Sequence, residues 1–279
     1  MNSSAVFERS GLAGFSDLSD PAWSSLLSFL EREQEKFLAQ EARFRSPDYP
    51  WPRDCLHTFS RIWEYPYAYY HLKRWKEHAA LPNGSVVVDV GSGTTFFPFS
   101  VARLGFDVVC VDPDAICCRD LAKAIAVTDV APGSVRGLEA GGDKIPLPSG
   151  GADAVYCISV LEHLPSYEGT VREMARMLKP GGLLILTIDL SADQTSEISL
   201  ENHRKLTSAL REHFEYVYPE TTVHPADFLH SNAGPYPMWS PPGSLLRRAL
   251  RPWGRKIKAR LGWKPPLYLL CQGFVMRKK

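Results

Sequence analysis

A short run of acidic and glycine residues has the composition of a nucleotide-binding turn. Asp89 lies in the apolar, β-branched stretch Val86–Val90, and Gly91 and Gly93 follow it directly. Because glycine has no Cβ and tolerates positive φ, such a turn brings backbone amides close to a ligand. Asp112 lies about twenty residues further on, after a second apolar stretch, where a carboxylate can accept hydrogen bonds from both hydroxyls of a ribose. The pattern predicts a bound nucleoside; the alternative is a tight turn that binds nothing.

The residues after the second glycine narrow the choice of ligand. A dinucleotide fingerprint, Gly-x-Gly-x-x-Gly, requires glycine at position 96, where this chain has Phe96. Phe96, Phe97 and Pro98 also crowd the start of the following helix, where a pyrophosphate would lie. An acid at position 112 serves NAD and S-adenosylmethionine alike, but these bulky residues favour a ligand without phosphates. They therefore disfavour a nicotinamide oxidoreductase.

From residue 85 onward, apolar stretches of strand length alternate with amphipathic stretches of helical spacing. This alternation predicts βαβ units in a doubly wound, mostly parallel α/β fold. The expected strands are Val86–Val90, Val108–Val111, Ala154–Ile158, Leu183–Ile188, Glu215–Tyr218 and Leu267–Met276. The expected helices are Pro98–Leu104, Asp114–Val127, Glu168–Leu178 and Asn202–Phe214.

The N-terminal part of the chain is expected to be helical. Ser19-Asp20-Pro21 combines a capping side chain with proline at the first helical position, which predicts a helix from there to about Ala42. Pro66 is expected in the first turn of a second, aromatic-rich helix that ends near Ala80. We therefore divide the chain into a helical extension, residues 1–82, which caps the active site, and a domain, residues 83–279, with a proline-rich, lid-like insertion at 219–265.

Further motifs give the chain a resemblance to a known family. Asp143-Lys144-Ile145-Pro146-Leu147-Pro148 precedes Ala152–Leu164, and Met177–Leu186 contains the turn Lys179-Pro180-Gly181-Gly182. Together with the glycine turn, and in this order over about half of the chain, they resemble the class I S-adenosylmethionine-dependent methyltransferases of the small-molecule type. The resemblance implies a seven-stranded Rossmann-like sheet, S-adenosyl-L-methionine as the cofactor, and methyl transfer to oxygen or nitrogen of a sugar, secondary metabolite or lipid-linked intermediate.

The resemblance also implies roles for individual residues. In that family the first motif holds the methionine part of the cofactor, the acid after the second strand holds the ribose, the third motif lies against the adenine, and the fourth strand ends beneath the sulfonium. The cofactor-binding residues so implied are Asp89, Gly91, Ser92, Gly93, Asp112, Pro113, Asp143, Lys144, Ile145 and Ser159. Two positions depart from the pattern: Thr95 replaces a third glycine, and the acid that often contacts the adenine amine is matched by Gly141, two residues before Asp143.

Methyl transfer to a hydroxyl or an amine requires in-line positioning and removal of a proton. His163 is the leading candidate for the base, because it follows the fourth strand at the edge where ligands bind and an imidazole titrates near neutral pH. The alternative is that Glu162-His163-Leu164 merely begins a helix beside the pocket. The expected acceptor-binding residues are Tyr65, Tyr67, Tyr69, Asp189 and His203, although the tyrosines equally suit a helix packed on the sheet edge.

Cysteine usage and the N-terminus favour a cytoplasmic protein. The six cysteines include no Cys-x-x-Cys spacing, so no structural metal is expected, and their usage is that of a reducing compartment. The first residues lack the basic segment and apolar core of a secretory signal, and no apolar run approaches the roughly 18 residues of a spanning helix.

Charge is distributed unevenly along the chain, although the net charge is only +1. Eleven of the 32 basic residues follow Asp227, the last acidic residue, which leaves 21 basic against 31 acidic residues before it. The basic tail, residues 247–264, is expected to be solvated surface or to bind a phosphate-bearing or lipid-linked acceptor peripheral to a membrane. Nucleic acid is the least favoured partner, because no RNA-binding module is recognised. The alternative function is a non-catalytic S-adenosylmethionine-binding module that docks a partner through this tail.

Overall fold

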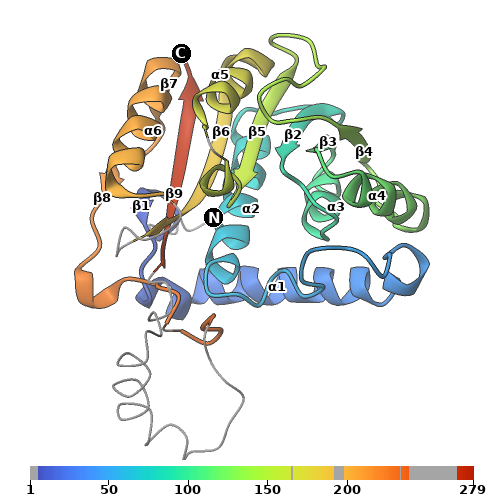
Figure 1. Ribbon diagram of the computed structural model, residues 1–279, viewed down its shortest axis with the longest axis horizontal. Helices are drawn as coiled ribbons and strands as arrows, with labels where there is room; N and C mark the ends of the chain where they lie inside the picture. The colour runs from blue at the N-terminus through green and yellow to red at the C-terminus, as the bar shows by residue number, and fades with distance from the viewer. Residues whose placement is uncertain (1–5, 165, 192–197, 233, 239–268) are drawn as a thin grey trace, which may run out of the picture.

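The computed structural model describes residues 6–164, 166–191, 198–232, 234–238 and 269–279 (Figure 1). They build one mixed sheet of nine strands, in the order β4-β3-β2-β5-β6-β9-β1-β8, with β7 also paired to β9. Strands β4, β3, β2, β5 and β6 run parallel, and β9 is antiparallel to β6. The strands are β1 (Ser10–Leu12), β2 (Ser85–Val90), β3 (Phe106–Asp112), β4 (Ser134–Glu139), β5 (Ala152–Ile158), β6 (Leu178–Ser191), β7 (Phe214–Tyr216), β8 (Glu220–Thr221) and β9 (Leu269–Lys278).

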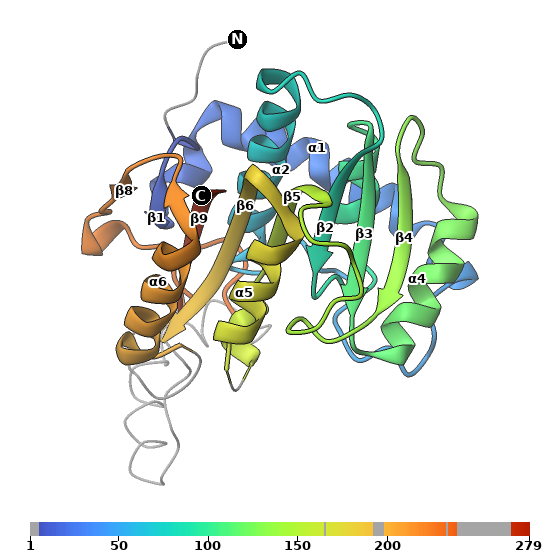
Figure 2. The ribbon, with the colours of Figure 1, turned by 90° about the horizontal axis from the view of Figure 1, so that it is seen from above.

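Helices cover both faces of the sheet (Figure 2). Helices α2, α3 and α4 cover one face, α5 and α6 cover the other, and α1 packs across α2 and α3. The helices are α1 (Pro21–Leu38), α2 (Arg61–His78), α3 (Phe97–Ala102), α4 (Ala115–Val127), α5 (Glu168–Met177) and α6 (Leu200–His213), with short 3-10 turns η1 (Ser16–Ser19), η2 (Glu41–Arg43), η3 (Leu161–His163) and η4 (Pro225–Asp227).

The central strands are apolar because both of their faces are covered. In β2, Val87 belongs to the core under α2, α3 and α4, whereas Val88 belongs to the core under α5 and α6. In β5 every residue is buried. This burial explains why the sequence of these strands is a continuous apolar run rather than an alternation of apolar and polar residues. Because these strands run parallel, the polar residues at their carboxyl ends lie at one edge of the sheet.

The N-terminal helices share the core of the sheet. Asp20 caps α1 by accepting from the amide of Ala22 at 2.8 Å, as its sequence predicts. A Cβ placed on Gly273 of β9 would lie 2.7 Å from Tyr67 and 2.8 Å from Trp63, so both rings of α2 lie directly on the strand. Helix α2 thus packs directly on β9 of the sheet.

Pro66 lies inside α2 and not in its first turn, which differs from the sequence-based expectation. A proline cannot donate to the carbonyl four residues earlier, which here is that of Ile62. The indole Nε1 of Trp23 in α1 donates to this carbonyl at 3.2 Å instead. A tertiary contact therefore replaces the missing helical hydrogen bond.

The structure confirms the doubly wound, mostly parallel α/β fold. Each strand and helix expected from residue 85 onward is present, with ends shifted by a few residues. The expected seven strands are extended to nine by the short strands β1 and β8, both of which lie beyond β9. The sequence analysis did not identify β4, an edge strand in which only Val135 is buried.

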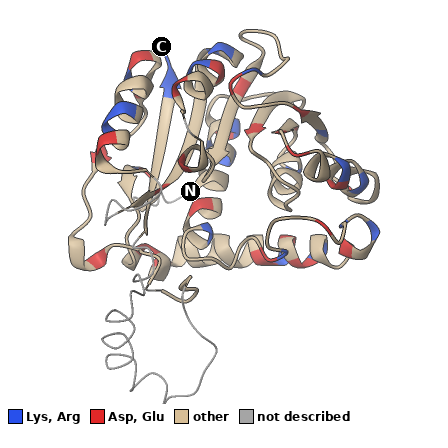
Figure 3. Ribbon diagram, in the orientation of Figure 1, with Lys and Arg blue, Asp and Glu red and all other residues tan. Residues whose placement is uncertain are grey.

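Most of the expected insertion at 219–265, and the whole basic tail at 247–264, lie outside the described residues. None of the helices in the described part of the chain has the length and apolar character needed to span a membrane. In Figure 3, acidic and basic residues are mixed along the ribbons of α1 and α6.

Candidate functional site

The glycine turn after β2 has the backbone conformation that only glycine adopts readily. Gly91 and Gly93 have φ values of 76° and 54°. A Cβ on Gly91 would lie 2.4 Å from Cγ2 of Val160, which follows β5. The turn is tied to the neighbouring strand because the amide of Gly91 donates to the carbonyl of Val111 at 2.8 Å. Glycine is thus required both for conformation and for close packing against the next loop.

Asp112 at the end of β3 connects the turn to the start of α4. One oxygen, Oδ2, accepts from the amide of Gly93 at 2.8 Å, and Oδ1 accepts from the amide of Asp114 at 2.9 Å. Burial raises the pKa of the Asp112 carboxyl, and these two hydrogen bonds lower it in part. Each oxygen keeps a further lone pair, so the carboxylate can still accept from a ligand at this edge.

Asp89, the acid within β2, is buried and 5% exposed. Its Oδ2 accepts from the hydroxyl of Tyr156 in β5 at 2.9 Å. Burial, with the nearby Asp112 carboxylate, raises the pKa of Asp89 to about 8. The acid at the base of the turn therefore holds its proton over most of the neutral range.

The loop after β5 begins with a strained residue. Ser159 has a φ of 46°, which is uncommon for a residue with a side chain. Its amide donates to the carbonyl of Thr187 at 3.0 Å, and its Oγ donates to Oε1 of Glu64 at 2.6 Å. Glu64 is fully buried in α2, and its other oxygen accepts from the guanidinium of Arg61. Helix α2 thus holds the turn that ends β5.

Two adjacent side chains of η3 point in opposite directions. His163 is exposed, whereas Glu162 is 8% exposed. Oε1 of Glu162 accepts from the amide of Asp189 at 3.2 Å. Burial and the neighbouring Glu64 raise the pKa of the Glu162 carboxyl to about 8.

Two carboxylates and a thiol from three elements gather near this point. Oxygens of Glu64 and Asp189 and the Sγ of Cys271 lie within 4.8 Å of one another. The cation in this cluster is the guanidinium of Arg61, which faces Glu64 and Asp189. Burial raises the pKa of the Cys271 thiol well above its usual range, so it is neutral.

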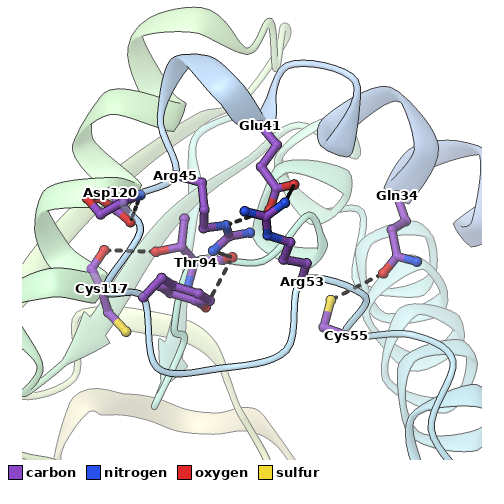
Figure 4. Close-up of polar contacts among 10 residues, drawn as sticks. Gln34, Glu41, Arg45, Arg53, Cys55, Thr94, Cys117 and Asp120 are labelled. Atoms are coloured by element: carbon purple, nitrogen blue, oxygen red, sulfur yellow. Dashed lines mark hydrogen bonds and ion pairs between the residues drawn. The ribbon is translucent and has the colours of Figure 1, made fainter.

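A segment that precedes α2 lies against the glycine turn (Figure 4). The amide of Thr94 donates to the hydroxyl oxygen of Tyr49 at 3.0 Å, and Arg45 donates to the carbonyl of Thr94 at 3.0 Å. The Thr94 hydroxyl donates to the carbonyl of Cys117 in α4 at 2.9 Å. Asp120 of α4 accepts from the amide of Ser46 at 2.7 Å, which fixes the segment at its other side.

The remaining predicted cofactor residues lie along the same edge. Pro113, Asp143 and Lys144 are exposed, whereas Ser92 and Ile145 are buried. The amide of Ile145 donates to Glu173 of α5 at 2.7 Å, which fixes this segment beside the sheet.

The structure does not bring all predicted acceptor residues together. Tyr65 stacks on Phe97 with ring centroids 4.6 Å apart. Tyr67 donates to the carbonyl of Arg9, and Tyr69 packs against Phe29, so core contacts account for both rings. Nε2 of His203 lies 2.8 Å from Oε1 of Gln272 in β9, and burial lowers the pKa of this imidazole.

Sequence reasoning did not single out Glu64, Arg61, Tyr49 or Glu162. Glu162 had a usable signal, because it directly follows a buried strand at the carboxyl edge. The others come from the N-terminal part of the chain, and only the fold places them beside the turns after β2 and β5.

A cavity of about 240 Å³ opens beside η3. Its wall includes Leu161 and Glu162 of η3, Glu168 of α5, and Asn202 and Lys205 of α6. The cavity therefore lies at the carboxyl edge, next to the loop that ends β5, where open α/β sheets bind their ligands.

Comparison with known proteins agrees with this geometry. Residues 88–186, from β2 into β6, match the family model described as a methyltransferase domain. The chain therefore carries a methyltransferase domain of the class I S-adenosylmethionine-dependent type. S-adenosylmethionine is the cofactor of this family.

The chain spans only part of the length of the curated relatives that it matches. An uncharacterized methyltransferase of Mycobacterium sp. (strain JLS) is 33% identical over 106 residues, which is 38% of this chain and 39% of the relative. A ubiquinone biosynthesis O-methyltransferase of Xanthomonas axonopodis pv. citri is 30% identical over 165 residues, which is 57% of this chain and 62% of the relative. Among solved structures, the [4+2]-cyclase SpnF is 17% identical with a TM-score of 0.52, over 97% of this chain and 99% of that chain, which concerns the fold alone.

Proposed function

We propose that this protein transfers the methyl group of S-adenosylmethionine to oxygen or nitrogen of a small-molecule acceptor. The observation that carries the proposal is the glycine turn. Gly91 and Gly93 have positive φ, and Asp112 of the next strand accepts from the Gly93 amide at 2.8 Å. This arrangement places a carboxylate that can accept from ribose hydroxyls at the carboxyl edge of the sheet, beside the glycine turn. A Cβ on Gly91 would clash with Val160, so glycine at this position lets the turn pack against the loop after β5.

The proposed cofactor contacts follow the sheet edge from β2 to β5. Asp89 and the turn residues Gly91, Ser92 and Gly93 would hold the methionine part. Asp112 and Pro113 would hold the ribose, and Asp143, Lys144 and Ile145 would lie against the adenine. Ser159 would lie beneath the sulfonium. When bound, the cofactor supplies a methyl group that positively charged sulfur has already activated.

We further propose that residues 1–82 form a cap over this site. The contacts of Arg45 and Tyr49 with Thr94 support a role for this segment in fixing the glycine turn. His163 remains the proposed base, and Asp189 and His203 remain proposed acceptor-binding residues. The charge asymmetry of the sequence supports a phosphate-bearing or lipid-linked acceptor, and cosedimentation with anionic vesicles would test it.

Isothermal titration calorimetry tests the cofactor assignment. We expect one S-adenosylmethionine per chain, and at least tenfold weaker binding in Asp112→Ala, since hydrogen bonds to a charged group contribute about 1.5–3 kcal/mol each. Asp107→Ala is the matched control, because it removes an acid from the opposite end of the same strand. Equal affinities of the two variants would refute the ribose assignment. Transfer of labelled methyl groups into cell extract would separate an enzyme from a binding module.

A further inference from the structure

The large apolar side chains that stay exposed are gathered at one end of the molecule. Among the described residues, five such side chains are more than a third exposed: Phe15, Trp51, Leu200, Tyr236 and Met238. Single exposed apolar side chains are normal on a protein surface, so their number needs no explanation. Their position does, because all five lie at the carboxyl edge of the parallel strands.

Three of these side chains, those of Phe15, Tyr236 and Met238, form what we call the apolar patch. A Cβ on Gly234 would lie 3.8 Å from the ring of Phe15, so the segment that carries Tyr236 and Met238 passes beside this ring. The ring of Tyr236 lies against the imidazole of His57, with centroids 4.8 Å apart. The patch therefore connects the segment after β8 with the segment that precedes α2.

Backbone hydrogen bonds place the apolar patch at the carboxyl edge. The amide of Met238 donates to the carbonyl of Ser231 at 2.9 Å, and the amide of Ser231 donates to that of Leu269 at 3.0 Å. Leu269 pairs with Ser191, the last residue of β6. In Figure 1, the orange segment after β8 accordingly lies at the end of the sheet toward which the parallel strands point.

The two other exposed side chains flank the patch at the same edge. Leu200 begins α6, and Ile198, two residues before it, pairs with the carboxyl end of β6. Tyr49, two residues before Trp51, accepts from the amide of Thr94 beside the glycine turn. The exposed apolar side chains therefore surround the edge that carries the proposed cofactor site.

The positive charge of the sequence is attached to this same edge. The chain leaves the edge after Met238 and returns to it at Leu269, and the thirty residues between them contain eight Lys or Arg and no Asp or Glu. Residues 1–227, in contrast, contain 21 basic and 31 acidic residues. A soluble polyanion would use this charge and leave the apolar patch in water. An anionic bilayer uses both, because its headgroups attract Lys and Arg and its interface accepts aromatic and aliphatic side chains.

We propose that the apolar patch is a docking surface for a membrane that contains anionic lipids, so that the carboxyl edge of the sheet faces the bilayer. The inference rests on the proposed function and deepens it, because the acceptor would then reach the site from the lipid side. The side chains of the patch enter the boundary between headgroups and acyl chains, and the charge of residues 239–268 attracts the headgroups. The acceptor class that fits is an amphiphile whose apolar part stays in the bilayer.

Cosedimentation with vesicles measures docking without cofactor or acceptor. The full chain is mixed with vesicles of phosphatidylcholine alone, or of phosphatidylcholine with about one third phosphatidylglycerol. We expect at least tenfold tighter binding to the anionic vesicles, and weaker binding as the salt concentration rises. Equal binding to both kinds of vesicle, or binding to neither, would overturn the proposal.

Two triple variants separate the apolar patch from the basic charge. Replacing Phe15, Tyr236 and Met238 together by serine removes apolar surface and no charge, so binding to anionic vesicles should weaken at least tenfold. Replacing the same three residues by leucine keeps the apolar character and should leave the affinity within about threefold of wild type. Because all three side chains are exposed, both variants should keep the urea midpoint of the wild type. Wild-type affinity in the serine variant would show that the patch does not dock.

Hydrogen exchange with anionic vesicles present locates the docking face. Exchange should slow at the amides of Phe15 and Met238, which donate to the carbonyls of Asp227 and Ser231, and stay unchanged at the amide of Gly84, at the opposite edge. Slowing at Gly84 alone would assign docking to another face and contradict the proposal.

Other partners of the same surface give different results. Ultracentrifugation would show a dimer in the wild type and a monomer in the serine variant if a second copy of the chain covered the patch. Binding to an RNA oligonucleotide, retained in the serine variant and without binding to vesicles, would assign the basic charge to nucleic acid. Either result would overturn membrane docking.

Calorimetry with S-adenosylmethionine tests the proposed function separately. If vesicles bind through the patch but the cofactor does not bind, the docking surface stands and the methyltransferase proposal fails. If the cofactor binds but vesicles do not, the docking surface alone is refuted.

Discussion

Replacing Asp89 by asparagine should change how the stability of the protein depends on pH. The folded-state pKa of Asp89 is about 8, whereas an aspartate in an unfolded chain titrates near 3.9. Between these values the folded protein holds a proton that the unfolded chain releases. Stability from this group is therefore full below pH 4 and is lost as the pH rises toward 8. The slope is about 1.36 kcal/mol per pH unit, or roughly 2.7 kcal/mol between pH 5 and pH 7.

Urea denaturation without cofactor, at pH 5, 6 and 7 and constant ionic strength, measures this difference. The free energy of unfolding of the wild type should fall by about 2.7 kcal/mol relative to that of Asp89→Asn over this range. Tyr156→Phe is the control, because it removes the hydrogen-bond donor but keeps the acid, and it should show the wild-type slope. Parallel curves for wild type and Asp89→Asn would mean that Asp89 is already ionised in the folded protein, and would refute the reasoning.

Two further substitutions probe the glycine turn. Gly91→Ala should lower the free energy of unfolding by about 1–3 kcal/mol, because it forces a side chain into positive φ and against Val160; adding Val160→Ala should recover part of the loss, and no recovery would mean that the contact is unimportant. Tyr49→Phe leaves the amide of Thr94 without its acceptor, so hydrogen exchange of that amide should quicken about tenfold, equivalent to about 1.4 kcal/mol; unchanged exchange would show that Tyr49 does not hold the turn.

The parts of the fold that could be predicted are those that local patterns in the sequence determine. The strand that ends at Gly91 shows its burial as a continuous β-branched run, and Asp20-Pro21 marks the start of α1 by its own chemistry. Strand β4 was missed for the same reason, since only Val135 of its side chains is buried and an exposed edge strand needs no apolar pattern.

The acceptor side of the site could not be predicted because it depends on contacts distant in sequence. The hydroxyl of Ser159 donates a hydrogen bond to Glu64, which lies 95 residues earlier in the chain. Nothing near Glu64 marks it as functional, because it is one acid among buried aromatic residues of α2. Likewise, only the fold shows that Glu162 points inward and His163 outward within the same short turn.

The place of β9 in the sheet has a consequence for how the chain folds. β9 pairs with β6 on one side and with β1 and β7 on the other, yet it follows all the other described strands in the chain. Until residues 269–278 have left the ribosome, the Leu- and Ile-rich edge of β6 has no partner and can pair with other chains. The N-terminal strand β1 also lacks its pairing with β9 until β9 has been synthesised. The sheet is therefore completed only after β9 has been synthesised, and the edge of β6 is exposed to aggregation until then.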